Sequence, residues 1–114
     1  MAIDYSKQIG KKITTKGNQK ICIHLESIMY IRSEGGLAVI FLNDESNVEE
    51  IKTLKEFEED LSNTGFVRIS RNTIINGRYI TKADTNYDKR VVYLGKIALK
   101  ISKRHLIELK KCLF

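Results

Sequence analysis

The sequence lacks proline entirely and contains only two cysteines among its 114 residues. Without proline, the turns have to be made by Gly, Asn, Asp and Ser. Cys22 and Cys112 are too few for a disulfide-stapled secreted scaffold, which favours a reducing environment. No apolar run approaches the roughly 18 residues of a membrane span, and residues 1–10 lack the apolar region of a secretory signal. We therefore expect a cytoplasmic protein with no membrane partner.

Metal-ligand and catalytic motifs are also missing from the sequence. Cys22 and His24 would face the same side of a strand, but two ligands are too few for a metal site, and no closer group of histidines and cysteines occurs. Phosphate-binding loops, dinucleotide fingerprints, nucleophile elbows and zinc-protease motifs do not occur. We expect no metal, no cofactor and no enzymatic activity.

Charge is distributed unevenly along the chain. The formal net charge is +6, but residues 44–60 contain eight acidic side chains and only two lysines, a net charge of −6. The rest of the chain has 18 basic and six acidic residues and therefore carries +12. Such an excess suits a polyanionic partner, and nucleic acid is the first candidate. The alternative is a basic domain that is simply well solvated.

Short β-branched and apolar segments separated by polar turns indicate a mainly β fold. We predict strands within residues 12–15, 20–24, 28–31, 37–42, 67–70, 79–85, 90–94 and 96–101. The first two flank the polar turn 16–19 and form a predicted hairpin. No repeat, linker or low-complexity segment divides the chain, so residues 1–114 form one predicted domain, with residues 1–8 as an N-terminal tail.

Two short helices interrupt the predicted strands. Thr53 and Glu56 form a capping-box pattern at the start of the first helix, and Gly65 suits a left-handed cap at its end. The apolar face of this helix consists of Leu54, Phe57 and Leu61. The second helix begins after Ser102, and its apolar face consists of Leu106, Leu109, Cys112 and Leu113. Cys112 is therefore a predicted small core residue.

Basic side chains gather at a strand end and at a helix start. Arg68 and Ser70 alternate with apolar neighbours and should leave their strand on one face, and Arg71 and Asn72 follow directly. The second group surrounds Ser102 and consists of Lys100, Lys103 and Arg104. Cations in a first helical turn oppose the helix dipole by about 0.3–1 kcal/mol. A phosphate bound at this helix start would compensate, whereas the simpler alternative is that both side chains extend into water.

The segment 66–76, FVRISRNTIIN, resembles the signature of the LytTR DNA-binding domain, in which an F-x-R-I-H-R-S-x-I-V-N-like run follows an amphipathic helix. Segments 25–31, 53–61 and 101–106 resemble the other motifs of this family and occur in the same order. The resemblance covers roughly residues 9–114. Ser70 stands where relatives frequently have His, and Asn72 stands where they have Ser.

The resemblance implies an elongated stack of antiparallel β-sheets with two short α-helices. It also implies sequence-specific binding of double-stranded DNA in bacterial transcription regulators, with loops that enter successive major grooves. The implied contact regions are the turn at Ser33–Leu37, which includes Gly36, the strand end at Ser70–Asn72, and the pair Lys103 and Arg104.

Relatives bind paired direct repeats, so a second copy on DNA is an expected partner. Relatives also usually follow a receiver domain controlled by a sensor kinase, in a two-component system. The sequence does not decide between a stand-alone regulator and a part of a longer one.

Within this expected interface, Arg71 is the first candidate for a base-edge contact, because its fork matches guanine O6 and N7. Arg104 is the second candidate, and Lys103 and Lys100 are expected near phosphates. Asn72 either pairs with adenine or stabilises its turn. Arg68 either contacts the DNA backbone or packs along the sheet.

Alternative functions use other features of the sequence. A protein-interaction module without DNA contact would use the acidic helix 53–61, which we expect to point away from DNA. A barrel that binds RNA or single strands would need clustered aromatic residues, but Tyr79, Tyr87 and Tyr93 are scattered. A cyclic-dinucleotide barrel would need an acidic-serine-glycine motif after its arginines, and none follows Arg71.

Overall fold

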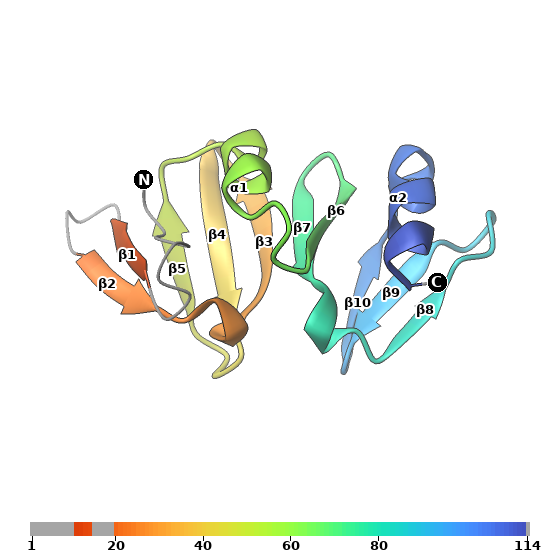
Figure 1. Ribbon diagram of the computed structural model, residues 1–114, viewed down its shortest axis with the longest axis horizontal. Coiled ribbons are helices and arrows are strands. Elements are labelled where there is room, and N and C mark those ends of the chain that lie inside the picture. Colours follow the sequence, from red (N-terminus) through yellow and green to blue (C-terminus); the bar gives the residue numbers. More distant parts are fainter. Residues whose placement is uncertain (1–10, 15–19, 114) are drawn as a thin grey trace.

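The computed structural model describes residues 11–14 and 20–113, and these contain ten strands in three antiparallel sheets (Figure 1). The first sheet is the predicted hairpin of β1 (Lys11–Thr14) and β2 (Lys20–Ile23). The predicted tail 1–8 and the turn 16–19 lie outside the described residues, as do the side chains of Cys22 and Cys112.

A five-stranded sheet forms the centre, in the order β5-β4-β3-β7-β6. Its strands are β3 (Ile28–Glu34), β4 (Leu37–Leu42), β5 (Asn47–Glu50), β6 (Phe66–Ser70) and β7 (Thr73–Asn76). The third sheet has the order β10-β9-β8 and consists of β8 (Lys82–Asp84), β9 (Val91–Leu94) and β10 (Ile97–Lys100). The sheets follow one another along a molecule of 42 × 29 × 25 Å, which confirms the predicted elongated stack.

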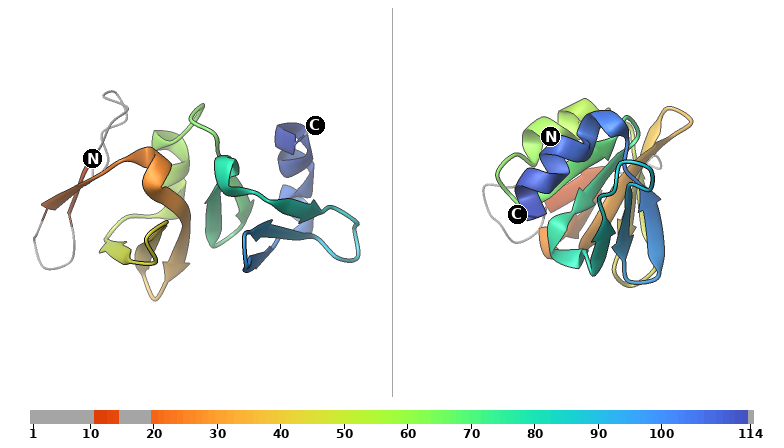
Figure 2. Two further views of the ribbon diagram at one scale, coloured as in Figure 1. Left: turned by 90° about the horizontal axis from the view of Figure 1, so that it is seen from below. Right: turned by 90° about the vertical axis from the view of Figure 1, so that its right-hand side faces the viewer.

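The helices are short, as predicted. They are α1 (Leu54–Asp60) and α2 (Lys103–Leu113), with the 3-10 turns η2 (Leu25–Ser27) and η3 (Gly77–Tyr79) between strands. Figure 2 shows both α-helices on the same side of the stack. None of the helices in the described part of the chain is long and apolar enough to cross a membrane.

Two apolar clusters cover the two faces of the central sheet. The first includes Phe57 of α1, its C-cap Leu61, and the inward-facing Ile31, Ile40 and Ile74. The second joins the opposite face to the third sheet and to α2, and includes Tyr30, Ile69, Ile75, Val92, Leu94, Leu99, Leu106 and Leu109. Because strand side chains alternate between faces, one central sheet can serve both clusters.

The capping box of α1 is present as the sequence predicts. The Thr53 hydroxyl accepts a hydrogen bond from the Glu56 amide (3.1 Å), and the Glu56 carboxylate accepts one from the Thr53 amide (2.9 Å). The predicted cap at Gly65 is wrong, because α1 already ends at Asp60 with Leu61 as its cap. Gly65 has a φ of +93° and instead turns the chain into β6.

We predict that Phe57→Ala lowers the free energy of unfolding by about 3–5 kcal/mol, because this fully buried ring fills the space between α1 and the central sheet. Ile51→Ala is the matched control, since Ile51 is 74% exposed and its loss should change stability by less than about 0.5 kcal/mol. Urea unfolding followed by circular dichroism measures both values. Equal losses in the two variants would contradict the assignment of Phe57 to the core.

Candidate nucleic-acid interface

The three segments singled out in the sequence lie along one edge of the molecule, the upper edge in Figure 1. These segments are the β3–β4 turn, the β6–β7 turn and the start of α2. Two backbone hydrogen bonds join them: the Ser33 amide donates to the Asn72 carbonyl (2.9 Å), and the Ser102 amide donates to the Ile69 carbonyl (2.8 Å). The β6–β7 hairpin is therefore fixed to the other two segments.

A β-bulge shapes the end of β6. Arg68 pairs with Ile74 and Ser70 pairs with Thr73, so Ile69 is an extra residue on this strand. The bulge interrupts the simple alternation of side chains. Arg68 lines the groove beside α1, whereas Ser70 lines a hollow beside β10. The prediction that Arg68 and Ser70 leave the strand on one face is therefore wrong.

Arg68 packs inside the structure and holds the β6–β7 turn. Its side chain is 17% exposed and pairs with Glu58 of α1 (3.2 Å). Its Nε donates to the Ser70 carbonyl (3.0 Å), and its Nη2 donates to the Arg71 carbonyl. Of the two roles left open by the sequence, these contacts favour packing over an exposed contact with a DNA backbone.

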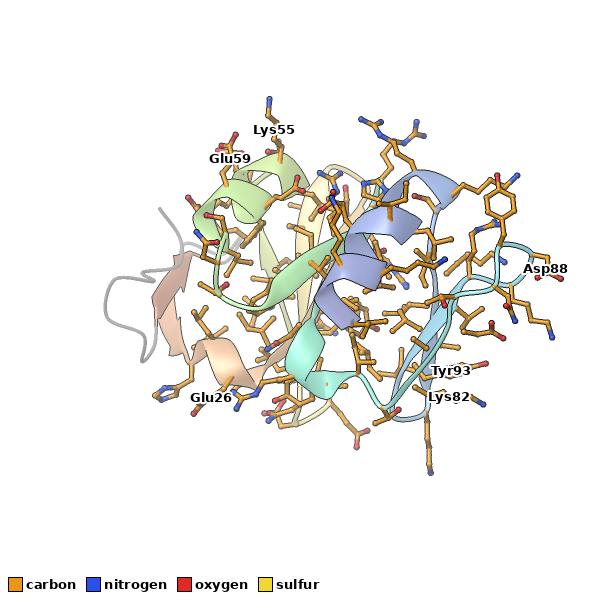
Figure 3. The ribbon with its side chains drawn as sticks, turned by 45° about the vertical axis from the view of Figure 1, so that its right-hand side comes forward. Glu26, Lys55, Glu59, Lys82, Asp88 and Tyr93 are labelled. Atoms are coloured by element: carbon orange, nitrogen blue, oxygen red, sulfur yellow. The ribbon has the colours of Figure 1, made fainter. Side chains whose placement is uncertain are left out.

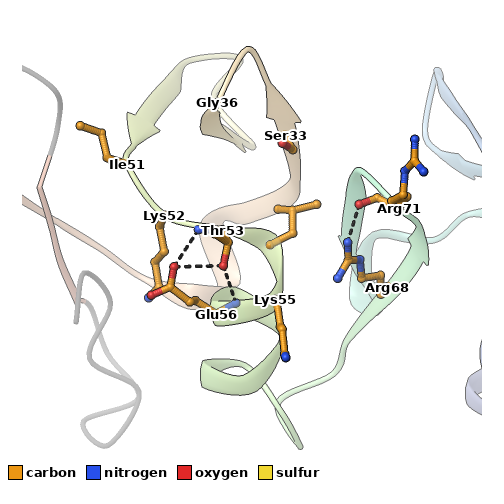
Figure 4. Close-up of a pocket in the computed structure, with 10 residues that line it drawn as sticks. Ser33, Gly36, Ile51, Lys52, Thr53, Lys55, Glu56, Arg68 and Arg71 are labelled. Atoms are coloured by element: carbon orange, nitrogen blue, oxygen red, sulfur yellow. Dashed lines mark hydrogen bonds between the residues drawn. The ribbon is translucent and has the colours of Figure 1, made fainter.

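The turn itself is closed by short polar side chains. The Ser70 hydroxyl donates to Asn72 Oδ1 (2.8 Å) and accepts from the Asn72 amide (3.3 Å), and the Thr73 hydroxyl also bonds to Oδ1 (3.1 Å). Of the two roles left open by the sequence, these bonds favour stabilisation of the turn by Asn72. The exposed Arg71 side chain extends beyond the turn and makes no hydrogen bond within the described residues (Figure 4).

The β3–β4 turn depends on two glycines. Gly35 and Gly36 have φ values of +56° and +84°, a region that side chains with a Cβ atom rarely adopt. Both are exposed, so Gly36 offers backbone rather than a side chain to a ligand.

A groove separates α1 from the β6–β7 turn (Figure 4). The β3–β4 turn contributes Gly36, the hairpin contributes Arg68 and Arg71, and the first turn of α1 contributes Lys55 and Glu56. The start of the acidic helix thus borders the same edge as Arg71. That this helix points away from DNA stays a prediction, and the structure shows only that its first turn lines the same groove as Arg71.

Three carboxylates of α1 have partners, and of these only the Thr53 cap of Glu56 follows from the sequence pattern. Glu56 caps the helix through Thr53, Glu58 pairs with Arg68, and Asp60 pairs with Lys52, whose side chain is nearly buried. This pairing offsets much of the negative charge that the sequence suggests for the helix surface.

Ser102 caps α2 and organises its first turn. Its hydroxyl accepts from the His105 amide (3.2 Å) and lies 2.6 Å from His105 Nδ1. The hydroxyl can donate to Nδ1 or accept from it, depending on the tautomer of the imidazole. Partial burial and the positive charges of Arg68 and Arg104 hold the pKa of His105 below its usual value, against the opposing effect of Glu58 and Glu108.

The cations near the start of α2 differ in their surroundings. Arg104 is exposed and makes no hydrogen bond or ion pair among the described residues. Lys100 Nζ donates to the Lys89 carbonyl (2.8 Å), and Lys103 Nζ lies 5.1 Å from the centre of the Tyr87 ring. Sequence reasoning missed Tyr87 as part of this site, because nothing in the pattern indicates that residues 87 and 103 are neighbours.

No group of three potential metal ligands occurs among the described side chains.

We predict that Arg68→Ala lowers the free energy of unfolding by about 1–3 kcal/mol, because two backbone carbonyls of the turn lose their donor. Glu58→Gln should cost less than about 1 kcal/mol, since the Glu58 carboxylate is half exposed. Chemical unfolding of both variants separates the carbonyl contacts from the ion pair. A larger loss in Glu58→Gln would mean that the ion pair, rather than the turn, is the important contact.

We predict that acidification destabilises the protein through His105. In the unfolded chain this histidine takes up its proton near pH 6.5, whereas in the folded state it does so at lower pH. Stability is therefore lost as pH falls through the unfolded pKa, and the loss levels off below the folded pKa. His105→Asn should remove this step while the carboxylates titrate as before. Unfolding measured from pH 7.5 to 5 tests this, and parallel pH profiles for the two proteins would refute it.

Comparison with known proteins agrees with the fold described above. A structure of the LytTr DNA-binding domain of a protein described as a methyl-accepting/DNA response regulator from Bacillus cereus superposes with a TM-score of 0.78. The two are 18% identical, and the alignment covers 91% of this chain and 95% of that one, which shows a shared fold. A search of curated proteins found no match. The family model described as the LytTr DNA-binding domain matches residues 18–114. The chain therefore belongs to the LytTR family of DNA-binding domains.

Proposed function

We propose that this domain binds a specific sequence in double-stranded DNA and regulates transcription, with its upper edge in Figure 1 against the duplex. Membership of the LytTR family supports DNA binding and transcription regulation, and it favours a binding role over catalysis. One observation carries the finer proposal: the three expected contact segments are tied together on one edge, where Arg71 and Arg104 are exposed and unpaired among the described residues.

Contacts in successive major grooves, which are about 34–36 Å apart along B-DNA, belong to this proposal. The β3–β4 turn would approach one groove through the backbone at Gly36, and α2 would approach the next. The β6–β7 turn lies between them.

Each side chain of the interface has a proposed role. Arg71 and Arg104 contact base edges, because a guanidinium can bind guanine O6 and N7 together. Lys103 and Lys100 lie near phosphates and set the position on the duplex. Ser70 and Asn72 stabilise the β6–β7 turn through their side chains, and Arg68 donates hydrogen bonds to carbonyls of the turn.

The partners remain part of the proposal. Paired direct repeats would place a second copy of the domain on the same DNA. A receiver domain controlled by a sensor kinase would supply the signal, and the cytoplasm would be the place of action.

A protein-interaction module that uses α1 is the alternative. The contacts in the structure determine which residue of α1 best tests this alternative. Glu58 pairs with Arg68, which holds the β6–β7 turn, so reversing the charge of Glu58 would also disturb DNA binding. Glu59 is exposed and shares no such contact among the described residues, which makes Glu59→Lys the cleaner test.

We predict that Arg71→Ala weakens binding to the selected site by about 1–3 kcal/mol and affects random DNA much less. The site is first obtained by selection from a pool of random duplexes, and fluorescence anisotropy then measures the affinities over a series of salt concentrations. Glu59→Lys, the matched control, should keep the preference for that site. Equal losses of Arg71→Ala on both DNAs would make Arg71 a phosphate contact. If the wild-type protein binds no duplex at about 100 mM salt, the interaction module becomes the better proposal.

A further inference from the structure

The loop of residues 85–90, between β8 and β9, is built onto the segment that precedes α2. The Ile101 amide donates to the Arg90 carbonyl (2.8 Å), and Arg90 Nε donates to the Ile101 carbonyl (3.0 Å). Lys100 adds the bond to the Lys89 carbonyl. Within the loop, the amides of Lys89 and Arg90 both donate to the Asn86 carbonyl (2.9 Å each). The loop therefore has a defined position beside the start of α2.

Tyr87 is the prominent side chain of this loop. It is 62% exposed. Lys103 Nζ and Arg90 Cζ lie 5.1 Å and 5.7 Å from the centre of its ring. Its hydroxyl makes no hydrogen bond within the described part of the chain. The hydroxyl of Tyr79, in contrast, donates to the Glu26 carbonyl and accepts from Asn43 (3.1 Å).

The surroundings of Tyr87 are strongly basic. Residues 85–90 and 100–104 together contain five cations and one acid, a net charge of +4. Arg90 is committed to carbonyl oxygens of its own loop and of Ile101. Among the described residues Lys103 contacts the Tyr87 ring alone, so its ammonium hydrogens stay available to an anion.

On this basis we infer that the Tyr87 hydroxyl and the Lys103 ammonium together bind one phosphate of the DNA backbone. The inference rests on the proposed function, and it extends the interface beyond the three segments to a fourth. A phosphate accepts hydrogen bonds from both groups, and the loop forms the end of the molecule next to α2, beside Asp88 in Figure 3. Because cations already lie over the ring, the hydroxyl is the group left for the ligand. This contact positions the domain and does not read the sequence.

The structure offers a control pair with the same chemistry. Lys82 Nζ lies 5.5 Å from the centre of the Tyr93 ring, much as Lys103 does over Tyr87. Figure 3 shows Lys82 and Tyr93 on the lower side of the molecule, away from the start of α2. Tyr93→Phe should therefore leave DNA binding unchanged.

The experiment compares the affinities of wild type, Tyr87→Phe and Tyr93→Phe for the selected duplex and for a scrambled duplex. Tyr87→Phe keeps the ring beneath Lys103 and removes only the hydroxyl. We expect it to weaken binding about tenfold on both duplexes, the size of a lost hydrogen bond to a charged group. Its salt dependence should stay that of wild type, whereas Lys103→Ala should reduce the salt slope by about one.

Phosphate ethylation locates the contact. Ethylating a single backbone phosphate at the end of the site should weaken wild type and have little further effect on Tyr87→Phe. A Tyr87→Phe variant that binds both duplexes as wild type does, or a similar loss in Tyr93→Phe, would overturn the inference. Failure of wild type to bind any duplex would instead overturn the proposed function itself.

Discussion

The arrangement of the interface depends on the single extra residue in β6. The bulge leaves Ile69 without a partner on β7, and its side chain is fully buried in the second cluster. The Ile69 carbonyl accepts a hydrogen bond from the Ser102 amide, and the side chain of Ser102 caps α2. Since β6 is the outer strand of the central sheet, this bond also covers part of an open sheet edge. One residue thus anchors the hairpin in the core and fixes the start of α2 to it.

Electrostatic pairing explains how an acidic helix and a basic edge occupy the same side of the molecule. The carboxylates of Glu58 and Asp60 each face a cation, which reduces the net negative charge of the helix surface. The Arg68 charge is in turn used within the protein, where it holds carbonyls of the turn. The guanidinium groups of Arg71 and Arg104, in contrast, are exposed and have no ion-pair partner among the described residues.

Local sequence rules predict the secondary structure of this domain well and its interface only in part. The capping box at Thr53, the start of α2 after Ser102 and most strands follow from patterns within a few residues. The bulge at Ile69 does not, because the alternation of Val67 to Ser70 is that of a regular strand. Contacts between distant segments, such as Lys103 with Tyr87, depend on tertiary packing and leave no local signal. The family resemblance points to three segments that the structure joins by hydrogen bonds, but not to which side chains are already occupied by internal contacts.

Some side chains of the proposed interface are held by internal contacts and others are free. This division suits a protein that both positions itself on DNA and distinguishes its bases. Fixing a lysine or arginine costs up to about 2 kcal/mol of side-chain entropy. Lys103 lies over an aromatic ring on a hydrogen-bonded loop, and this restriction would reduce the entropy lost in the proposed phosphate contact. Arg71 is held differently: its backbone is fixed by the turn, while its guanidinium stays free to adjust to a base edge. Rigid phosphate contacts would then set the register within which a mobile guanidinium discriminates between bases.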